Sequence, residues 1–413
     1  MSFQDAIYLI TLLIEVAVLF YLELKTWNTL YTPLNFLMLP YVVVLMITVL
    51  LAGSSWGFVE FYYPSIFIWN VGLLLFAIPS YSIGAVLKYN NISVHRKPLR
   101  EHFPKIHLIM AFLLSAVFIW HLKGVVTSSV ESLGSDEFGD EFSGGGLWGH
   151  LRQFTLPLLM MSIYYVSRRR WWLWLVIVVF LAIGMLNQVK GWVIIPVLSA
   201  MAMRLYTGKT RLTLRLLGYV VLGAFSVFFL SYALSILVVQ NRGVSEGFME
   251  FIFGHFFHYL TSGTFGWSMD LERGLPDAGG SFQNVIAQLV NLAKSLVGDS
   301  ELISPVNPLY YNSGLTLTNV RTIFGTLYIN STHAQFAVYV LFISTMMYML
   351  KLAMLYFNNI YIYVIYFFYC GLLFMGWFDL YFASLTILEF PILTLLMLLL
   401  DRVLQEKTTD VTK

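Results

Sequence analysis

The chain has 413 residues, of which 59% are hydrophobic, 17% aromatic and only 11% charged, and its mean hydropathy is +0.76. A soluble domain carries about 25% charged residues, so this composition excludes a soluble protein and predicts an all-α polytopic membrane protein. The net charge of +2 gives no argument for nucleic-acid binding, and the single cysteine, Cys370, excludes an intramolecular disulfide or a cysteine-rich metal site.

Eleven apolar segments approach the ~20 residues needed to cross a bilayer, which predicts one integral membrane domain over residues 1–413. They lie at 5–24, 34–52, 66–87, 106–122, 147–166, 171–187, 190–206, 213–239, 333–350, 358–376 and 380–400. The fifth is the least regular, because His150, Arg152 and Gln153 occupy its first turns. No positively charged region precedes the first segment and no small-residue cleavage site follows it, so we expect a retained span.

Lysine and arginine alternate between the connections, and this alternation predicts the orientation of the spans. Basic residues gather after the third, fifth, seventh and ninth segments, whereas the connections 52–65 and 123–146 carry almost none. We therefore expect the N-terminus outside, the C-terminus in the cytoplasm and the long segment 240–333 on the extracytoplasmic side.

The segment 240–333 is the only long run without an apolar stretch of spanning length, and we expect it to cover the functional site. Aromatic spacing predicts an interfacial helix over 244–260, and apolar periodicity predicts an amphipathic helix over 281–297, packed on the membrane domain. Gly and Pro mark a loop at 273–280. Tyrosines beside amides and hydroxyls in 305–319 suit sugar rings, although the same composition also describes ordinary loop packing.

Some lysines and arginines fall outside the cytoplasm in this topology. They are Lys123, Arg152, Lys190, Arg242, Arg273, Lys294 and Arg321. Snorkelling to the outer headgroups accounts for Lys123 and Lys294. Charges deeper in the membrane usually face a protein interior or a wet cavity, so Arg152, Lys190, Arg242 and Arg321 together indicate a shared anionic ligand.

Three short patches of sequence stand out at the predicted outer face. Lys190-Gly191 opens a span, Tyr259 to Gly263 forms an aromatic Tyr-Leu-x-x-Gly run, and Thr318-Asn319-Val320-Arg321-Thr322 is followed by Tyr328. With the hydropathy and topology of nearly the whole chain, they resemble the Wzy family of O-antigen and capsular repeat-unit polymerases, which are enzymes of the bacterial inner membrane. Two positions depart from the family pattern: lysine replaces the span-opening arginine, and Tyr328 to His333 lacks the family's aspartate.

The resemblance implies a glycosyltransferase that works on the outer face of the membrane without a metal or a cofactor. It would transfer a glycan from undecaprenyl diphosphate to the end sugar of another lipid-linked repeat unit, toward lipopolysaccharide or capsule. Membrane lipid and the lipid-linked oligosaccharide would be its partners, with a chain-length regulator and a flippase as further ones.

The chemistry of this transfer suggests a role for each candidate residue. Negative charge grows on the leaving diphosphate, and fixed cations stabilise it; we expect this of Arg242 and Arg321, then of Lys190, Arg152 and Arg273. A base must take the proton of the attacking hydroxyl, and histidine suits that role because its pKa lies near ~6.5. The candidate bases are His255, His258 and His333, and the expected glycan contacts are Tyr259, Tyr310, Tyr311, Asn319 and Tyr328.

Other interpretations stay open. His255 and His258 could serve only to anchor an interfacial helix, and they lack a third ligand at convincing spacing for zinc. Asp270 and Glu272 are acidic alternatives for the base, but we expect both in a solvated loop. The rival functions are an outer-face glycan ligase and a lipid-linked oligosaccharide flippase or transporter, which would bind at the midplane; the deep acids that we identify are only Glu15 and Glu389.

Overall fold

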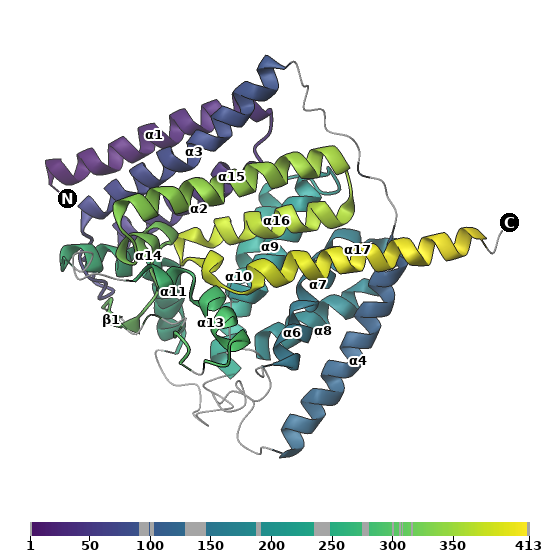
Figure 1. The fold of residues 1–413 in the computed structure, drawn as a ribbon. Helices are drawn as coiled ribbons and strands as arrows, with labels where there is room; N and C mark the ends of the chain where they lie inside the picture. Colours follow the sequence, from purple (N-terminus) through teal and green to yellow (C-terminus); the bar gives the residue numbers. More distant parts are fainter. Residues whose placement is uncertain are drawn as a thin grey trace. The chain divides into compact units, whose positions relative to one another are not determined.

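The computed structural model describes residues 2–90, 99, 103–128, 146–186, 191–234, 248–274, 281–299, 301–304, 307, 309–314 and 317–410. Within these ranges every regular element is a helix except one two-stranded antiparallel hairpin, in which Tyr311 lies opposite Thr318 (Figure 1). The chain divides into two compact units. Unit 1 comprises Met1–Arg96, Phe253–Tyr356 and Tyr369–Leu385, and unit 2 comprises Lys97–Ile252, Phe357–Phe368 and Thr386–Lys413.

Unit 1 combines three N-terminal helices with the long polar segment and the helices that follow it. Its elements are α1 (Phe3–Trp27), α2 (Pro33–Leu51), η1 (Tyr63–Ser65), α3 (Ile66–Tyr89), most of α11 (Phe248–Glu272), α12 (Phe282–Val285), α13 (Ala287–Leu296), β1 (Tyr311–Asn312), β2 (Leu317–Thr318), α14 (Ile323–Ile329), α15 (His333–Phe357), the end of α16 (Ile360–Phe374), η5 (Met375–Trp377) and η6 (Tyr381–Ala383). Local signals set the helix starts: Ser2 and Asp5 form a capping box at α1, and Thr32 caps α2, whose first residue is proline. α1 packs against α2 and α3.

Unit 2 is built on α4 (Lys105–Ser128) and the helices up to α10. They are α6 (Leu147–Gln153), α7 (Thr155–Tyr165), η2 (Arg168–Arg170), α8 (Leu173–Leu186), α9 (Gly191–Tyr206) and α10 (Leu214–Leu234), joined by the first part of α16 and by α17 (Thr386–Asp410). α7 packs against α8 and α9. The Arg204 guanidinium donates to the carbonyls of Ile163 and Tyr164 at 2.8 and 2.9 Å, which satisfies the C-terminal end of α7.

Six of the described helices are long and apolar enough to cross a membrane. They are Phe3–Trp27, Pro33–Leu51, Tyr63–Tyr89, Lys105–Thr127, His333–Phe357 and Ile360–Trp377, and each overlaps an expected span. Leu173–Leu186, Gly191–Tyr206 and Leu214–Leu230 are shorter apolar helices at three further expected positions. The protein is therefore an all-helical, multi-pass membrane protein, and the number of eleven crossings stays a prediction.

Two expected spans have different bounds in the structure. The segment 147–166 is divided at Phe154 into α6 and α7, and the polar residues His150, Arg152 and Gln153 lie in α6. The last helix begins at Thr386 and not at residue 380, because η6 and a short irregular stretch precede it.

The predicted interfacial helix over 244–260 is longer and more buried than expected. α11 continues to Glu272, and every residue from Thr261 to Asp270 is buried. The expectation of a loop position was therefore wrong for Asp270, which lies inside a helix, whereas Glu272 is exposed at its end. Serines, threonines and glycines weaken the apolar periodicity of this stretch, so hydropathy alone missed its burial.

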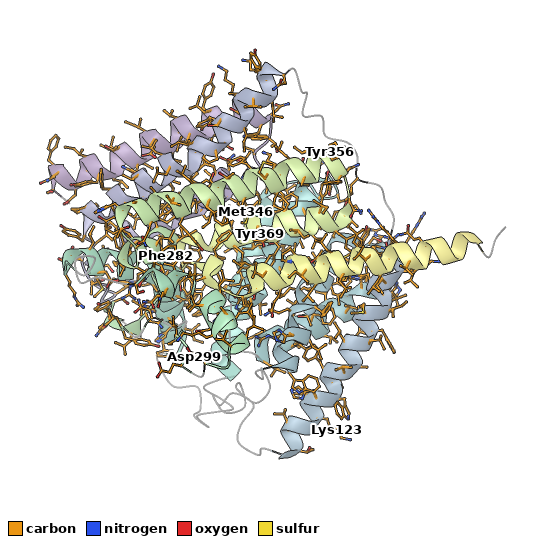
Figure 2. All side chains as sticks on the ribbon, in the orientation of Figure 1. Lys123, Phe282, Asp299, Met346, Tyr356 and Tyr369 are labelled. Atoms are coloured by element: carbon orange, nitrogen blue, oxygen red, sulfur yellow. The ribbon has the colours of Figure 1, made fainter. Side chains whose placement is uncertain are left out.

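The second predicted helix, over 281–297, is divided at Ile286 into α12 and α13. Ser281 caps α12, whose first residue, Phe282, is labelled in Figure 2. The Phe282 ring meets Tyr339 of α15 edge to face at 5.7 Å. Lys294, expected to reach the headgroups, forms an ion pair with Asp299 at 3.1 Å. Leu292 and Leu296 of α13 are exposed, so the packing on unit 1 covers only part of the apolar face.

Candidate functional site

The buried half of α11 approaches two neighbouring segments at backbone distance. A Cβ at Gly263 would overlap the carbonyl oxygens of Trp377 and Phe378, and a Cβ at Gly266 would overlap the carbonyl oxygen of Val320. Only glycine allows such an approach, because every other residue carries a Cβ. In unit 1 the helix that carries the Tyr259–Gly263 patch therefore lies against the Trp377–Phe378 segment at Gly263 and against the Thr318–Thr322 patch at Gly266.

A buried ion pair joins the Thr318–Thr322 patch to Asp270, which lies seven residues after Gly263 on α11. The Arg321 guanidinium donates from Nε to Asp270 Oδ2 and from Nη2 to Asp270 Oδ1 at 3.1 Å, and only 1% of each residue is exposed. Nη2 also lies 3.4 Å from the carbonyl oxygen of Leu309. This two-pronged contact orients a planar guanidinium, so Arg321 is held rigidly beneath the loop that precedes β1.

Tyr311 lies between two arginines at the exposed side of this pair. Its ring is 4.8 Å from the Arg321 guanidinium carbon and 4.4 Å from that of Arg273, and its hydroxyl bonds to Asp270. Burial raises the pKa of Tyr311, and the nearby Asp270 carboxylate adds to that rise. Arg273 is exposed, and none of the described carboxylates forms an ion pair with it. Arg273 is thus the cation of this cluster that a ligand can reach.

Asp379 supplies a second carboxylate beside Arg321. Its Oδ1 accepts from the Leu380 amide at 2.7 Å and from the Thr326 hydroxyl at 3.0 Å, and the Arg321 backbone amide also bonds to the carboxylate. Burial raises the pKa of Asp379 from 3.8 to about 6, and these hydrogen bonds with the Arg321 charge oppose that rise only in part. A carboxylate with this pKa is suited to general-base chemistry near neutral pH.

His258 forms hydrogen bonds with the β1–β2 hairpin. Its Nδ1 is 2.7 Å from Ser313 Oγ, and the ring also bonds to the backbone of Leu317. Burial, together with the neighbouring His255, lowers the pKa of His258 to about 4, so the ring is neutral at pH 7. The turn that holds Ser313 lies against Gly57, which requires Gly314 with its φ of +111°.

The remaining predicted residues of unit 1 differ in how far they are buried. His333 Nε2 lies 3.0 Å from the Tyr328 hydroxyl at an exposed position. The Tyr259 ring packs on Phe378 at 4.6 Å, and Asn319 Nδ2 donates to the Asn307 carbonyl at 3.4 Å. Tyr310 is exposed. His255 lies one turn before Tyr259 on α11 and is half-buried.

Arg152 lies in unit 2 and takes part in a separate polar cluster. Oε1 of Glu389 on α17 lies 2.5 Å from His150 Nδ1, and Arg152 lies within electrostatic range of the same carboxylate. Arg242 and Lys190 lie outside the described residues. The predicted meeting of Arg152, Lys190, Arg242 and Arg321 thus stays a prediction, with Arg321 and Arg152 placed in different units.

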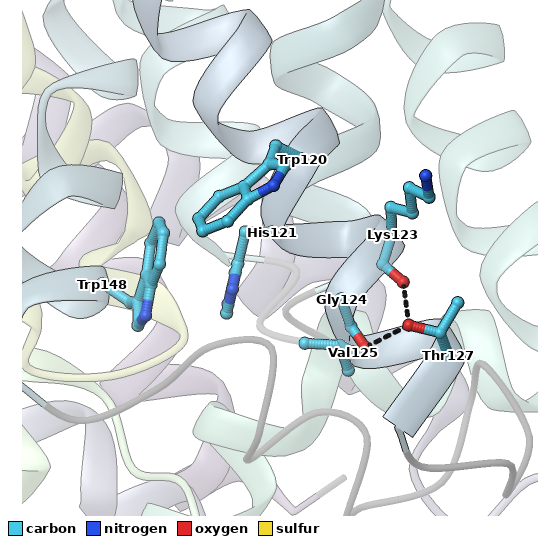
Figure 3. Close-up of a pocket in the computed structure, with 7 residues that line it drawn as sticks. All are labelled: Trp120, His121, Lys123, Gly124, Val125, Thr127 and Trp148. Carbon is cyan, nitrogen blue, oxygen red and sulfur yellow. Dashed lines mark hydrogen bonds between the residues drawn. The ribbon is translucent and has the colours of Figure 1, made fainter.

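Unit 2 also carries an aromatic hollow of about 380 Å³ at the end of α4. The His121 ring stacks on Trp148 at 3.8 Å, and Trp120 lies beside them, as Figure 3 shows. Lys123 borders the hollow, and the Thr127 hydroxyl donates to its backbone carbonyl at 2.9 Å. An exposed tryptophan, Trp120, beside a lysine at a helix end is typical of the membrane interface, and snorkelling of Lys123 stays a prediction.

The sequence reading missed two of the central residues. Asp379 falls between two apolar segments and has no polar neighbour in the chain, so its approach to Arg321 carries no local signal. Asp379 is nevertheless the one charged residue in Trp377-Phe378-Asp379-Leu380, which separates two expected spans. An acid at such a position often marks a functional site. The sequence predicts a solvated loop for Asp270, because the aromatic spacing that indicates the helix ends at residue 260.

The helices and this centre define a class: a multi-pass, all-helical membrane protein with a buried arginine–carboxylate centre beside an accessible arginine. A family model matches residues 57–407, and the chain belongs to that family, which is described as "Family of unknown function (DUF6337)". The match includes every residue of the centre and excludes α1. No curated protein and no solved structure matches the chain.

Proposed function

We propose that this protein is a membrane glycosyltransferase that polymerises lipid-linked oligosaccharide repeat units at the outer face of the bacterial inner membrane. The observation that carries the proposal is one arginine–carboxylate centre formed between the Thr318–Thr322 patch and α11, the helix that also carries the Tyr259–Gly263 patch. These are the patches that resemble the polymerase family. A centre with an accessible cation and a carboxylate of raised pKa has the two groups that the transfer needs.

Arg273 is the residue that we assign to the diphosphate of the donor. It is exposed and lies on the outer side of Tyr311, so its five N–H donors can face two phosphate oxygens at once. Arg321 acts differently, because Asp270 occupies its Nε and Nη2. Its charge and its contact with Tyr311 make it a positioning residue for Arg273.

Asp379 is the proposed general base. The acceptor hydroxyl attacks the anomeric carbon of the donor sugar, its proton passes to Asp379, and the bond to the diphosphate oxygen breaks as the new glycosidic bond forms. The leaving polyprenyl diphosphate takes both electrons of the broken bond, and fixed cations stabilise that charge. With a pKa of about 6, Asp379 is ionised at pH 7 and can accept a proton.

Complementation of a deletion strain tests the assignment, with glycan length read on a gel. Arg273→Ala and Asp379→Asn should abolish polymer and leave single repeats, while Arg273→Lys should retain part of the activity, because a lysine keeps the charge and loses the paired donors. Glu272→Gln is the matched control: it is the exposed neighbour of Arg273 and should give wild-type polymer. Wild-type chain length in both Arg273→Ala and Asp379→Asn would end the proposal.

A transporter or flippase is the second candidate, and one observation favours it. Glu23 of α1 and Lys351 of α15 are buried inside two membrane-spanning helices, with 0% and 1% of each residue exposed. Buried ionisable residues in spans often mark transport pathways. In the deletion strain a flippase predicts inward-facing precursor in place of outward single repeats, and an outer-face ligase predicts polymer stranded on its lipid carrier.

A further inference from the structure

A hollow in unit 1 opens at the N-terminal end of α1. It has a volume of about 580 Å³ and is enclosed by the first turns of α1, the end of α2 and the segment Glu60–Pro64 before α3. Small-molecule sites commonly occupy about 300–1,000 Å³, so the hollow can hold a ligand of one or two rings. In the predicted orientation it opens on the extracytoplasmic face.

The lining of the hollow selects one class of ligand. Tyr8, Tyr62 and Tyr63 supply aromatic faces and hydroxyls, Gln4 supplies an amide, and Asp5 and Glu60 supply carboxylates. No lysine or arginine is among the residues that line it. Two carboxylates without a cation disfavour a phosphate or a uronic acid, whereas hydroxyls and ammonium groups can donate to them. Aromatic faces beside such acceptors suit a neutral or amino sugar.

Two features fix the walls of the hollow. Gly53 has a φ of +61°, and a Cβ there would lie 2.5 Å from Glu60 Oε1, so glycine leaves room for the Glu60 carboxylate. The Tyr63 ring packs on Phe61 edge to face at 5.2 Å. Asp5 already accepts from the Ser2 amide at 2.6 Å in the helix cap, which makes Glu60 the carboxylate more open to a ligand.

The hollow is attached to the proposed catalytic centre. The Tyr62 backbone amide donates to Ser268 Oγ at 2.9 Å, and Ser268 lies two residues before Asp270 on α11. A sugar held here would therefore contact a wall anchored to the helix that carries the arginine–carboxylate pair. The donor diphosphate needs the cation at Arg273, so the hollow suits the partner that carries no phosphate at its reacting end.

We propose that this hollow binds neutral or amino-sugar residues of the acceptor glycan, with Glu60 accepting from ligand hydroxyl or ammonium groups and Tyr8 packing on a sugar ring. That the bound glycan is the acceptor of the transfer rests on the proposed function. The carbohydrate specificity itself rests only on the lining of the hollow.

Binding to the purified full-length protein in nanodiscs tests the inference without turnover. The probes are chitobiose, its deacetylated and cationic counterpart, and a disaccharide that contains glucuronate, each followed by saturation-transfer NMR and titration calorimetry. The cationic disaccharide should bind tightest, chitobiose should bind more weakly, and the glucuronate disaccharide should not bind. Equal binding of the glucuronate disaccharide would overturn the inference.

Variants connect the binding to the hollow. Glu60→Gln should weaken the cationic disaccharide by about tenfold or more, because one charge-assisted hydrogen bond is lost, and should change chitobiose less. Gly53→Ala should act in the same direction by displacing Glu60, and Tyr8→Ala should weaken both ligands. Glu272→Gln, outside the hollow, should leave both affinities unchanged. Unchanged affinities in Glu60→Gln and Tyr8→Ala would place any sugar binding elsewhere and end the proposal.

The two proposals can fail separately. If Arg273→Ala and Asp379→Asn abolish polymer but no disaccharide binds the hollow, the polymerase stands and this inference falls. If the disaccharides bind and depend on Glu60 while polymer length ignores Arg273 and Asp379, the sugar site stands and the polymerase falls.

Discussion

Unit 1 contains two buried cation–carboxylate combinations that differ in how completely they are bonded. Asp270 accepts two hydrogen bonds from Arg321 and one from Tyr311. Glu23 accepts from Ser80 and Tyr348 through Oε1, but its Oε2 has no hydrogen-bond partner among the described residues, and neither does Lys351 Nζ. Lys351 lies 4.2 Å from the Trp27 ring and within electrostatic range of Glu23. We call the first the closed pair and the second the open pair.

The difference shows what each combination contributes. Burying a charge is costly, and hydrogen bonds that satisfy both partners recover most of that cost. The closed pair therefore fixes the position of two chain segments, and removal of one partner leaves the other uncompensated. The open pair lacks part of that compensation, so its net contribution to the free energy of folding is small. Its unbonded atoms, Glu23 Oε2 and Lys351 Nζ, can each form a further hydrogen bond.

Loss of one member of the closed pair should have the largest effect. Asp270→Ala removes the carboxylate that accepts from Nε and Nη2 of the buried Arg321 guanidinium, and Asp379 does not bond to these nitrogens, so the free energy of unfolding should fall by about 3–5 kcal/mol. Chemical unfolding in detergent measures this. Glu272→Ala, two residues along the helix and exposed, should stay within about 0.5 kcal/mol of wild type.

A double variant distinguishes charge from shape in the closed pair. Asp270→Leu with Arg321→Met removes both charges, and most of the stability lost in Asp270→Ala should return, because no unpaired ion remains. A double variant as unstable as Asp270→Ala would show that packing, and not charge compensation, gives the pair its contribution.

The backbone contacts that support the closed pair should give the next largest effect. Gly266→Ala places a Cβ against the Val320 carbonyl, which must move together with Arg321, and we expect a loss of about 1–3 kcal/mol. Gly218→Ala on α10 is the control, since nothing lies within 4 Å of its added Cβ. The same unfolding measurement applies, and equal stabilities of the two variants would contradict the close approach.

The open pair should respond far less. Lys351→Met removes an ammonium that has no hydrogen-bond partner among the described residues and keeps an apolar chain of similar length against Trp27. We expect the free energy of unfolding to change by less than about 1 kcal/mol, since Glu23 keeps its hydrogen bonds from Ser80 and Tyr348 and the lost cation–π contact offsets the relief of burial. A loss of stability above about 3 kcal/mol in Lys351→Met would show that the open pair stabilises the fold as much as the closed pair does.

The smallest net effect on stability should come from a change of pH, because Asp379 and His258, two groups near the closed pair, have opposite pH dependences. Asp379 has a folded pKa of about 6 against an ordinary 3.8, so its contribution to stability is lost as pH rises from about 4 to about 6. His258 has a folded pKa of about 4 against 6.5, so its contribution is lost as pH falls through the same range.

Thermal unfolding between pH 4 and 7 separates the two groups. Wild type should show a shallow profile, Asp379→Asn should become more stable with rising pH, and His258→Gln should become less stable with rising pH. Parallel profiles in the two variants would show that neither group titrates as its burial requires.

Some residues of the site can be predicted from the sequence and others cannot. Arg321, Arg273 and Tyr311 were selected because cations and tyrosines in an outer segment stand out against apolar surroundings. The positions of Asp270 and Asp379 were not readable, because Asp270 is 51 residues from Arg321 and Asp379 is 58 away. Pairing across such separations depends on how helices pack, for which hydropathy gives no measure. Glu23 was missed for the same reason: it sits at the end of an expected span, and only the packing of α3 and α15 buries it.

The sequence by itself determined that this is an all-helical membrane protein and where its apolar helices run, because the bilayer imposes length and composition on each span separately. It also determined that one long segment, 240–333, has no apolar stretch of spanning length. Only the tertiary structure decided which charges meet, since a carboxylate can compensate an arginine only at hydrogen-bond distance. Glycines that permit backbone contact at Gly263 and Gly266 set that distance, and their effect depends on the neighbour that they face.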